Sequence, residues 1–91
     1  MAFDVRFSER YLADLRAAID NLWLVSRGAA ERFAEDHDRR VETLLAFPRV
    51  GTQLPKGRYA VPVGTTGYRI FYRVDGERLT LLRLQNVRRR R

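Results

Sequence analysis

The sequence contains no cysteine, one histidine and one lysine among its 91 residues. The absence of cysteine excludes a disulfide framework and a thiolate nucleophile. Because a lone histidine cannot build the usual zinc site, we expect neither a metal nor a cofactor. The sequence has no run of 18 apolar residues, which a membrane-spanning helix would need, and the opening MAFDVRFSER lacks the apolar stretch of a secretory signal. The sequence therefore predicts a cytoplasmic protein with no membrane partner.

Arginine is abundant instead, and it is unevenly placed. Residues 48–91 carry a net charge of +9, whereas residues 1–47 carry −2. Of the 18 basic residues, 17 are arginine, a bias that a GC-rich genome alone could produce. Guanidinium groups suit bidentate contacts with phosphate or carboxylate, so we expect an anionic partner for the second half of the chain.

The first half of the chain predicts one strand and two helices. Residues 3–7 alternate apolar and charged side chains, as a half-buried strand does. Apolar residues at helical spacing over 12–22 predict a helix that Ser8 caps and Gly28 ends. A second helix follows up to Pro48, because the residue before a proline disfavours helical backbone. The short connection makes the two helices antiparallel.

The second half predicts a loop and three strands. Residues 48–57 hold two prolines and two glycines, which is typical of a loop. Residues 58–63, 68–74 and 77–84 read as strands, and the Asp-Gly pair at 75–76 is a strong hairpin signal. We therefore predict an α+β fold in one domain over residues 1–91. It would consist of an N-terminal strand, an antiparallel helical hairpin and a three-stranded antiparallel meander, in a mainly antiparallel sheet of four strands.

A two-residue turn at Asp75-Gly76 would fix the register of the last hairpin. Tyr72 would then face Leu79, on an apolar side that the helices cover. The opposite side would carry a mixed set: Arg69, Phe71, Arg73, Arg78, Thr80 and Leu82. In this register Arg73 lies directly across from Arg78, which costs stability unless an anion or an acidic group lies nearby. This side is either a binding surface or the ordinary solvated face of the sheet.

The chain ends in four arginines. As a free tail they would contact polyanions without specificity. If the last strand continues through Leu84 and Asn86, the first of them are held at the end of the sheet. Four phosphate contacts would give a slope of roughly −3 to −4 in log K against log salt. The candidate contacts to a nucleic acid or another target are Arg58, Arg73, Arg78, Arg88, Arg89, Arg90 and Arg91.

Two single residues have ordinary structural explanations. His37 lies beside the apolar stripe of the second helix, and no serine or acidic partner is placed to form a triad with it. We interpret it as a structural or interface histidine. Trp23 lies beside the stripe of the first helix, where core packing or a partner interface explains it.

The segments FSERYLADL, FPRVG and GYRIFYRVDGERL and the closing arginines resemble the RelE/ParE superfamily of toxins from bacterial type II toxin-antitoxin modules. The resemblance covers essentially the whole chain and is sharpest in GYRIFYRV. It implies one of two activities: RelE-like members cut mRNA in the ribosomal A site, whereas ParE-like members poison DNA gyrase. It also implies a hetero-oligomer with a cognate antitoxin that folds onto the toxin. Candidate antitoxin contacts are Trp23, Phe71 and Leu82.

Arg69 and Arg89 match the positions of two catalytic arginines in the RelE pattern. The sequence departs from that pattern at Ala60 and Pro62, where RelE proteins commonly carry lysines, and a terminal tyrosine is missing after Arg91. Arginine stabilises a phosphorane but keeps its proton, so it serves poorly as base or acid.

The other groups that could transfer a proton are Lys56, Tyr59, Tyr68 and Tyr72, and Tyr72 is predicted on the core side. The resemblance therefore favours a ParE-like gyrase inhibitor. The alternatives are a RelE-like ribosome-dependent endoribonuclease and a basic nucleic-acid binding module without a toxin role. The chain has no helix-turn-helix pattern to support the last of these.

Overall fold

A computed structural model describes residues 4–87 of the chain. Two helices and a five-stranded sheet form in the order β1, α1, α2, β2, β3, β4, β5, with a short 3-10 turn, Pro55–Gly57, between β2 and β3. The bounds are β1 Asp4–Phe7, α1 Glu9–Val25, α2 Arg27–Ala46, β2 Thr52–Leu54, β3 Arg58–Pro62, β4 Tyr68–Asp75 and β5 Arg78–Asn86. The predicted α+β fold is confirmed, including the helical hairpin and the antiparallel strands that follow it.

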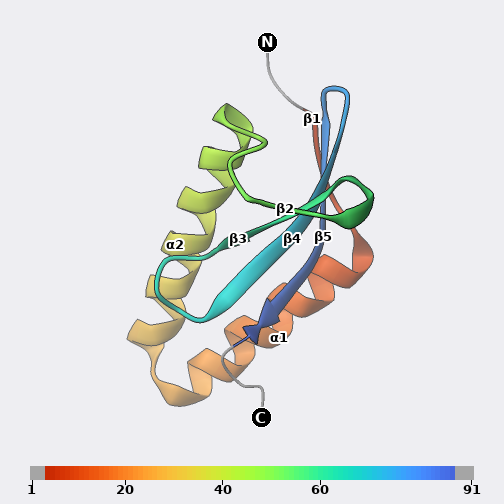
Figure 1. Cartoon of the computed structure of the whole chain (residues 1–91). Helices are drawn as coiled ribbons and strands as arrows, with labels where there is room; N and C mark the ends of the chain where they lie inside the picture. Colours follow the sequence, from red (N-terminus) through yellow and green to blue (C-terminus); the bar gives the residue numbers. More distant parts are fainter. Residues whose placement is uncertain (1–3, 88–91) are drawn as a thin grey trace.

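The sheet has one strand more than predicted. Its order is β1-β5-β4-β3-β2, with β1 parallel to β5 and every other pair antiparallel (Figure 1). The additional strand, β2, lies inside the segment predicted as a loop. It is only three residues long and lies between Pro48 and Pro55, so its local composition is that of a loop. Pairing with β3, not local propensity, makes it a strand.

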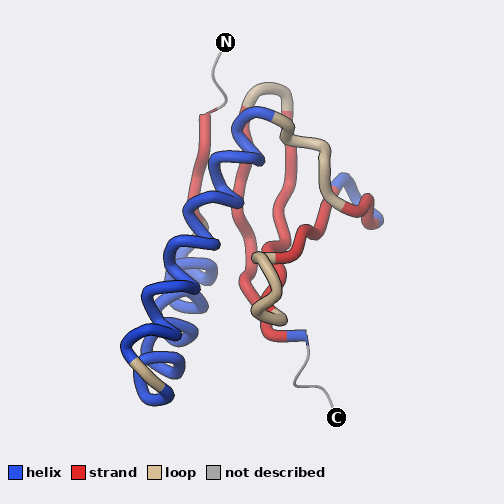
Figure 2. The backbone as a smooth tube through the Cα atoms, turned by 90° about the vertical axis from the view of Figure 1, so that its left-hand side faces the viewer, coloured by secondary structure: helices blue, strands red, loops and turns tan. Residues whose placement is uncertain are grey.

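The helices lie together on one side of the sheet and leave the other side open (Figure 2). Side chains from both layers meet in a core whose fully buried members are Tyr11, Phe33, Leu44, Val63, Ile70, Tyr72, Leu79 and Leu81. No helix within residues 4–87 is long and apolar enough to cross a membrane.

A single residue, Ser26, connects α1 to α2. Ser8 caps α1 as predicted, because its hydroxyl accepts from the Tyr11 N–H at 2.9 Å. The prediction that Gly28 ends this helix is wrong. Ser26 closes α1 and its hydroxyl accepts from the Ala29 N–H at 3.0 Å, so α2 begins at Arg27 with Gly28 inside its first turn. The second helix ends at Ala46, in agreement with the break expected before Pro48.

The hairpin register differs from the prediction by two residues. Asp75 pairs with Arg78, so the turn residues are Gly76 and Glu77. Gly76 has φ of +60°, and a left-handed residue at the first turn position suits the twist of a hairpin. Asp75 thereby avoids the left-handed backbone that the predicted turn would require of it. Since a shift of two preserves the faces, Ile70, Tyr72, Leu79 and Leu81 still point into the core.

A β-bulge changes the register again at Leu82. Tyr72 lies opposite Leu81 but Phe71 lies opposite Arg83, so Leu82 has no partner on β4. Beyond the bulge, Leu84 rather than Leu82 or Arg83 enters the core. The predicted two-residue turn would have put Arg69 opposite Leu82, whereas Arg69 lies opposite Gln85.

Asp14 on α1 fixes the helix to β5 where β1 has already ended. Its carboxylate accepts from Arg83 Nε at 2.8 Å and from the Leu84 N–H at 2.9 Å. Burial of Asp14 favours its neutral form, but the hydrogen bonds from Arg83 and Leu84 and the nearby cationic charges outweigh this and lower the pKa of Asp14. The carboxylate therefore satisfies a strand N–H and a guanidinium at the same time.

We expect Asp14→Ala to destabilise the fold by about 2 kcal/mol, because it leaves the Leu84 N–H and Arg83 without their acceptor. Because the folded pKa of Asp14 is depressed, its contribution is present at neutral pH. It fades as the pH falls below the ordinary carboxyl value of 3.8. The difference between wild type and variant in urea unfolding should be larger at pH 7 than at pH 3. Glu35→Ala, at an exposed site with no ion pair within residues 4–87, is the matched control. An equal loss at both pH values would contradict this role.

A second buried contact joins the two helices. The Tyr11 hydroxyl and His37 Nε2 lie 2.7 Å apart, and His37 is only 5% exposed. Burial, followed by the charge of Asp14, raises the pKa of Tyr11, so its hydroxyl keeps its proton. His37 Nδ1 also lies 3.3 Å from the Asp38 carboxylate, an acidic partner that the sequence did not predict. The burial of His37 between the helices agrees with its interpretation as a structural or interface histidine.

Candidate functional site

One cross-strand row on the open side of the sheet spans four strands and carries an arginine on three of them. Arg58 on β3 pairs with Arg73 on β4, Arg73 pairs with Thr80 on β5, and Thr80 pairs with Arg6 on β1. Cross-strand partners share a face, and the neighbouring rows, which contain Tyr72 and Leu79, point into the core. The three arginine side chains of this row are exposed. Together with Arg69, four residues before Arg73 on the same side of β4, they form what we call the basic face: Arg6, Arg58, Arg69 and Arg73.

Two arginines do lie opposite each other, but they are not the predicted pair. Arg73 faces Thr80 on β5, so its predicted opposition to Arg78 is wrong. Its like-charged neighbour is Arg58, on the other side of β4. The cost of this contact would be relieved by an anion bound between the two guanidinium groups.

The arginines of the open side differ in whether the chain already neutralises them. Arg58, Arg69 and Arg73 make no ion pair with any residue from 4 to 87. Arg78 instead lies 3.6 Å from Asp4, among Asp75 and Glu77, and Arg6 shares the same Asp4 carboxylate at 3.5 Å. Arg78 is thus already paired, and it lies diagonal to Arg73 instead of directly opposite it as predicted.

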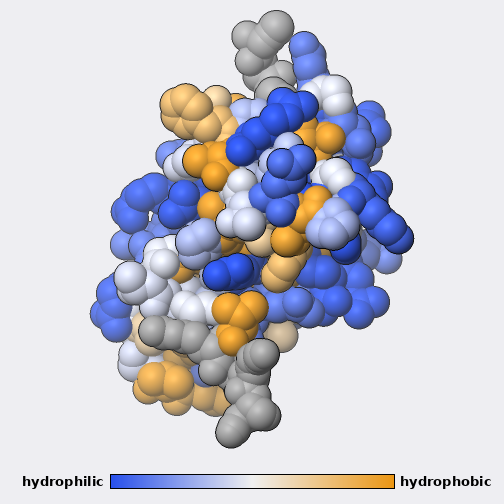
Figure 3. Space-filling view, in the orientation of Figure 1, coloured by the Kyte–Doolittle hydropathy of each residue, from blue (hydrophilic) through white to orange (hydrophobic). Residues whose placement is uncertain are grey.

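Apolar side chains interrupt the charges. Phe71 lies half-buried on β4 midway between Arg69 and Arg73, so β4 presents arginine, phenylalanine and arginine in alternation. Figure 3 shows hydrophilic and hydrophobic side chains interleaved over the strands on this side. Such a mixed surface suits an acidic partner that also has apolar side chains.

Arg69 borders a shallow depression at the lower end of the sheet. The depression has a volume of about 330 Å³ and is formed by the turn after β3, Pro62, Tyr68, Arg69 and Val87. The second predicted catalytic arginine, Arg89, lies outside the described residues, as do Arg88, Arg90 and Arg91.

The predicted antitoxin contacts are dispersed. Phe71 lies on the open side, and Leu82 is half-buried in the β-bulge, where its carbonyl accepts from the Ser8 hydroxyl at 3.0 Å. Trp23 lies near the end of α1, in the other layer of the molecule, and is 54% exposed. A partner that touches all three would have to reach around the molecule.

Tyr68 is the one proton-transfer candidate within residues 4–87 that borders the same depression as Arg69, and it is only 9% exposed. Tyr72 is buried, and its hydroxyl accepts from the Gly51 N–H at 3.1 Å. Burial raises the pKa of Tyr72 further from the physiological range. Tyr59 stacks on Tyr72 with 5.4 Å between ring centroids, and Tyr68 is buried against Phe33. Lys56 lies in the 3-10 turn beyond β2.

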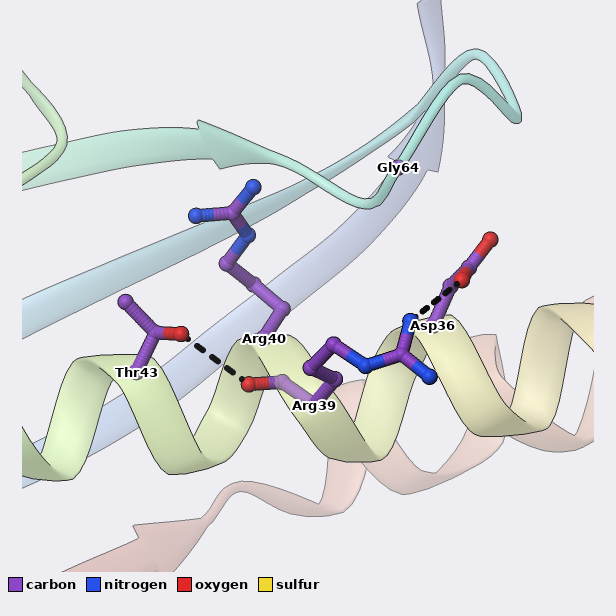
Figure 4. A pocket seen from close by; sticks show the side chains of 5 residues that line it. All are labelled: Asp36, Arg39, Arg40, Thr43 and Gly64. Carbon is purple, nitrogen blue, oxygen red and sulfur yellow. Dashed lines mark hydrogen bonds and ion pairs between the residues drawn. The ribbon is translucent and has the colours of Figure 1, made fainter.

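A second concave site lies between α2 and the β3–β4 loop. In Figure 4, Arg39 turns toward Asp36, with which it pairs at 3.2 Å, while Arg40 points toward the strands. A Cβ on Gly64 would lie 2.6 Å from the Asp36 carboxylate, and Gly64 has φ of +52°, so both space and backbone favour glycine there. Because a carboxylate already occupies this site, it is a poor anion site. No group of three acidic or histidine side chains within residues 4–87 could hold a metal ion.

Sequence reasoning missed two features of this region. Arg6 joins the basic face only because β1 pairs with β5, although the alternation of residues 3–7 already placed it on a solvent side. The Asp14–Arg83 contact spans 69 residues and has no local signal.

Comparison with known proteins gives one family match and several structural matches. The model of the ParE toxin of type II toxin-antitoxin system, parDE, matches residues 5–91. No curated protein matches the chain significantly.

Three solved structures illustrate the structural similarity. The chromosomal ParDE system from P. aeruginosa gives a TM-score of 0.79 at 19% identity, over 93% of this chain and 96% of that one. The intact E. coli RelBE toxin-antitoxin complex gives 0.67 at 20%, over 93% and 96%. The RelBE2 toxin-antitoxin complex from Mycobacterium tuberculosis gives 0.62 at 25%, over 94% and 99%.

Proposed function

Since this chain belongs to the ParE toxin family of type II toxin-antitoxin systems, we propose that it arrests growth by poisoning DNA gyrase through binding alone. As the toxin of such a module it has an antitoxin for its partner. The basic face would contact gyrase or the DNA that gyrase holds, and the protein would act in the cytoplasm, as one domain. The toxin itself would make and break no covalent bond.

The main support for this proposal is the chemistry of the open side. Cleavage of RNA at a 2′-hydroxyl needs a base, a group that stabilises the phosphorane and an acid for the leaving oxygen. Arg58, Arg69 and Arg73 can supply the second of these, because a guanidinium stays charged and donates several hydrogen bonds. Tyr59 and Tyr72 stack on the core side. Tyr68 borders the depression beside Arg69 but is largely buried against Phe33. A surface of this kind binds anions well and transfers protons poorly.

The same surface suits the antitoxin. The alternation of Arg69, Phe71 and Arg73 offers both charge and apolar contact to an acidic amphipathic segment. Such a segment would neutralise the excess positive charge of the toxin and cover the arginines that we propose contact the target. The antitoxin would therefore inhibit the toxin by covering the surface that contacts the target.

A RelE-like ribosome-dependent endoribonuclease is the second candidate. One observation favours it: Arg69 is unpaired within residues 4–87 and borders a depression large enough for a phosphate group. Arg69 and Arg89 would then hold the scissile phosphate of mRNA on the ribosome. Arg69→Ala should abolish cutting in that case.

Inducible expression in a bacterium, with and without the antitoxin, tests the proposal. We expect growth arrest with induction of the SOS response and trapped gyrase-DNA cleavage complexes, all suppressed by the antitoxin. A strain whose gyrase resists poisoning should grow. Codon-bounded mRNA cuts without DNA damage would establish the RelE-like alternative, and normal growth at confirmed folded expression would contradict both.

A further inference from the structure

The outer face of α1 is unusually apolar for a helix surface that covers nothing. Tyr11 and Ala18 point into the core, whereas Leu12, Trp23 and Leu24 are 50%, 54% and 84% exposed. Ala13 and Ala17 are exposed on the same side. In Figure 2 this helix belongs to the layer opposite the open side of the sheet, so its outer face and the basic face point in different directions.

The small residues of this face, Ala13 and Ala17, lie toward its N-terminal end beside Leu12 and Arg16. This N-terminal half contains a hollow of about 590 Å³, which Leu12, Arg16 and Asp20 complete. The C-terminal half carries Trp23 and Leu24, which project into solvent. One half is therefore shaped to receive side chains of the kind that the other half presents.

The charged side chains of this face would also complement those of a second α1 helix that runs antiparallel to it. Arg16 and Asp20 are exposed and make no ion pair with any residue from 4 to 87. In an antiparallel pair of α1 helices related by a two-fold axis between residues 18 and 19, Arg16 of each copy comes close to Asp20 of the other. The same axis brings Trp23 and Leu24 of each copy over Ala13 of the other, so large side chains meet small ones.

We propose that two copies of this chain pair antiparallel along α1, with Trp23 and Leu24 of each copy seated in the hollow around Ala13 and Ala17 of its partner. A second copy fits this face better than an acidic segment does, because Arg16 and Asp20 make the face electrically balanced. The basic faces of both copies stay open in such a pair, and the pairing does not depend on which target the toxin attacks.

The length of α1 limits the strength of this pairing. A helix of 17 residues is about 25 Å long, so two of them bury an area at the low end of specific interfaces, roughly 1,200 Å². We therefore expect a reversible dimer with a dissociation constant on the order of micromolar.

Sedimentation equilibrium of the full chain, freed from its antitoxin, tests this over a range of concentrations. We expect the wild type to dimerise and Leu24→Asp to weaken the dimer more than about tenfold, because it places a charge against Ala13 of the partner. Arg16→Glu and Asp20→Arg should each weaken it about fivefold, and the double variant Arg16→Glu/Asp20→Arg should restore it. Phe47→Asp, at a site of similar exposure on the segment after α2, should leave it unchanged. Circular dichroism confirms that each variant is folded.

Three results would overturn the pairing. A wild type that is monomeric throughout would exclude it. A dimer that survives Leu24→Asp with unchanged affinity would place the contact elsewhere. Weaker antitoxin binding by a folded Leu24→Asp variant of a monomeric toxin would show that the antitoxin occupies this face. Growth arrest is not used as a readout, so these results are independent of gyrase poisoning.

Discussion

The double variant Arg69→Glu/Arg73→Glu is expected to abolish growth arrest while the protein still folds. Both side chains are exposed on β4 and neither makes an ion pair within residues 4–87, so their replacement removes no internal contact of that kind. Each reversal replaces an attraction to an anionic partner by a repulsion. At about 2 kcal/mol for each lost contact, binding to the target weakens roughly 1,000-fold. Colony counts under induction measure the effect, and circular dichroism measures the fold.

The control for this variant must change the net charge equally. Arg32→Glu/Arg49→Glu does so at two exposed arginines outside the sheet, Arg32 on α2 and Arg49 in the loop that follows it. We expect this control to remain toxic. If both double variants lose toxicity to the same extent, total charge rather than the basic face determines it. If the β4 variant stays fully toxic, the basic face is not the target surface.

Tyr72→Ala is expected to cost about 3 to 5 kcal/mol of the free energy of unfolding, because it removes a large aromatic ring from the core. A protein of this length is stable by roughly 5 to 14 kcal/mol, so the loss is a large share of the total. Tyr72 is completely buried, stacks on Tyr59 and accepts from the Gly51 N–H. Urea unfolding followed by circular dichroism measures the change.

Comparison with Tyr72→Phe separates the ring from its hydroxyl. The phenylalanine variant keeps the packing and loses only the bond from Gly51, so we expect about 1 kcal/mol. Gly51 itself approaches too closely for a side chain, since a Cβ there would lie 2.6 Å from the Ala60 carbonyl oxygen. Equal losses in the two Tyr72 variants would mean that the hydroxyl, not the ring, stabilises this end of the sheet.

The parts of the fold that the sequence predicts are those with local causes. The Ser8 cap, the break before Pro48 and the apolar side of β4 each depend on a few neighbouring residues and a known period. The assignment of Tyr72 to the core survives the error in register, because that error moved the pairing by two residues and not by one.

The features that local sequence does not predict depend on distant pairing. β2 is a strand only because β3 lies beside it, and β1 contributes Arg6 to the basic face only through its parallel pairing with β5. The bulge at Leu82 places Arg83 opposite Phe71, and Arg83 then reaches Asp14 on α1. The pair Arg58–Arg73 depends on both local and distant causes. The local sequence indicates that several arginines lie on this side of the sheet, but only the sheet order identifies Arg58 as the neighbour of Arg73.

The most direct test of gyrase poisoning by the basic face uses purified components. Purified gyrase and supercoiled DNA are incubated with the wild-type toxin or with Arg69→Glu/Arg73→Glu, and cleaved DNA is measured after denaturation. The proposal predicts that the wild type accumulates cleaved DNA, that the double variant does not, and that neither cuts mRNA on ribosomes. Ribosome-dependent mRNA cleavage by the wild type, with no effect on gyrase, would contradict it.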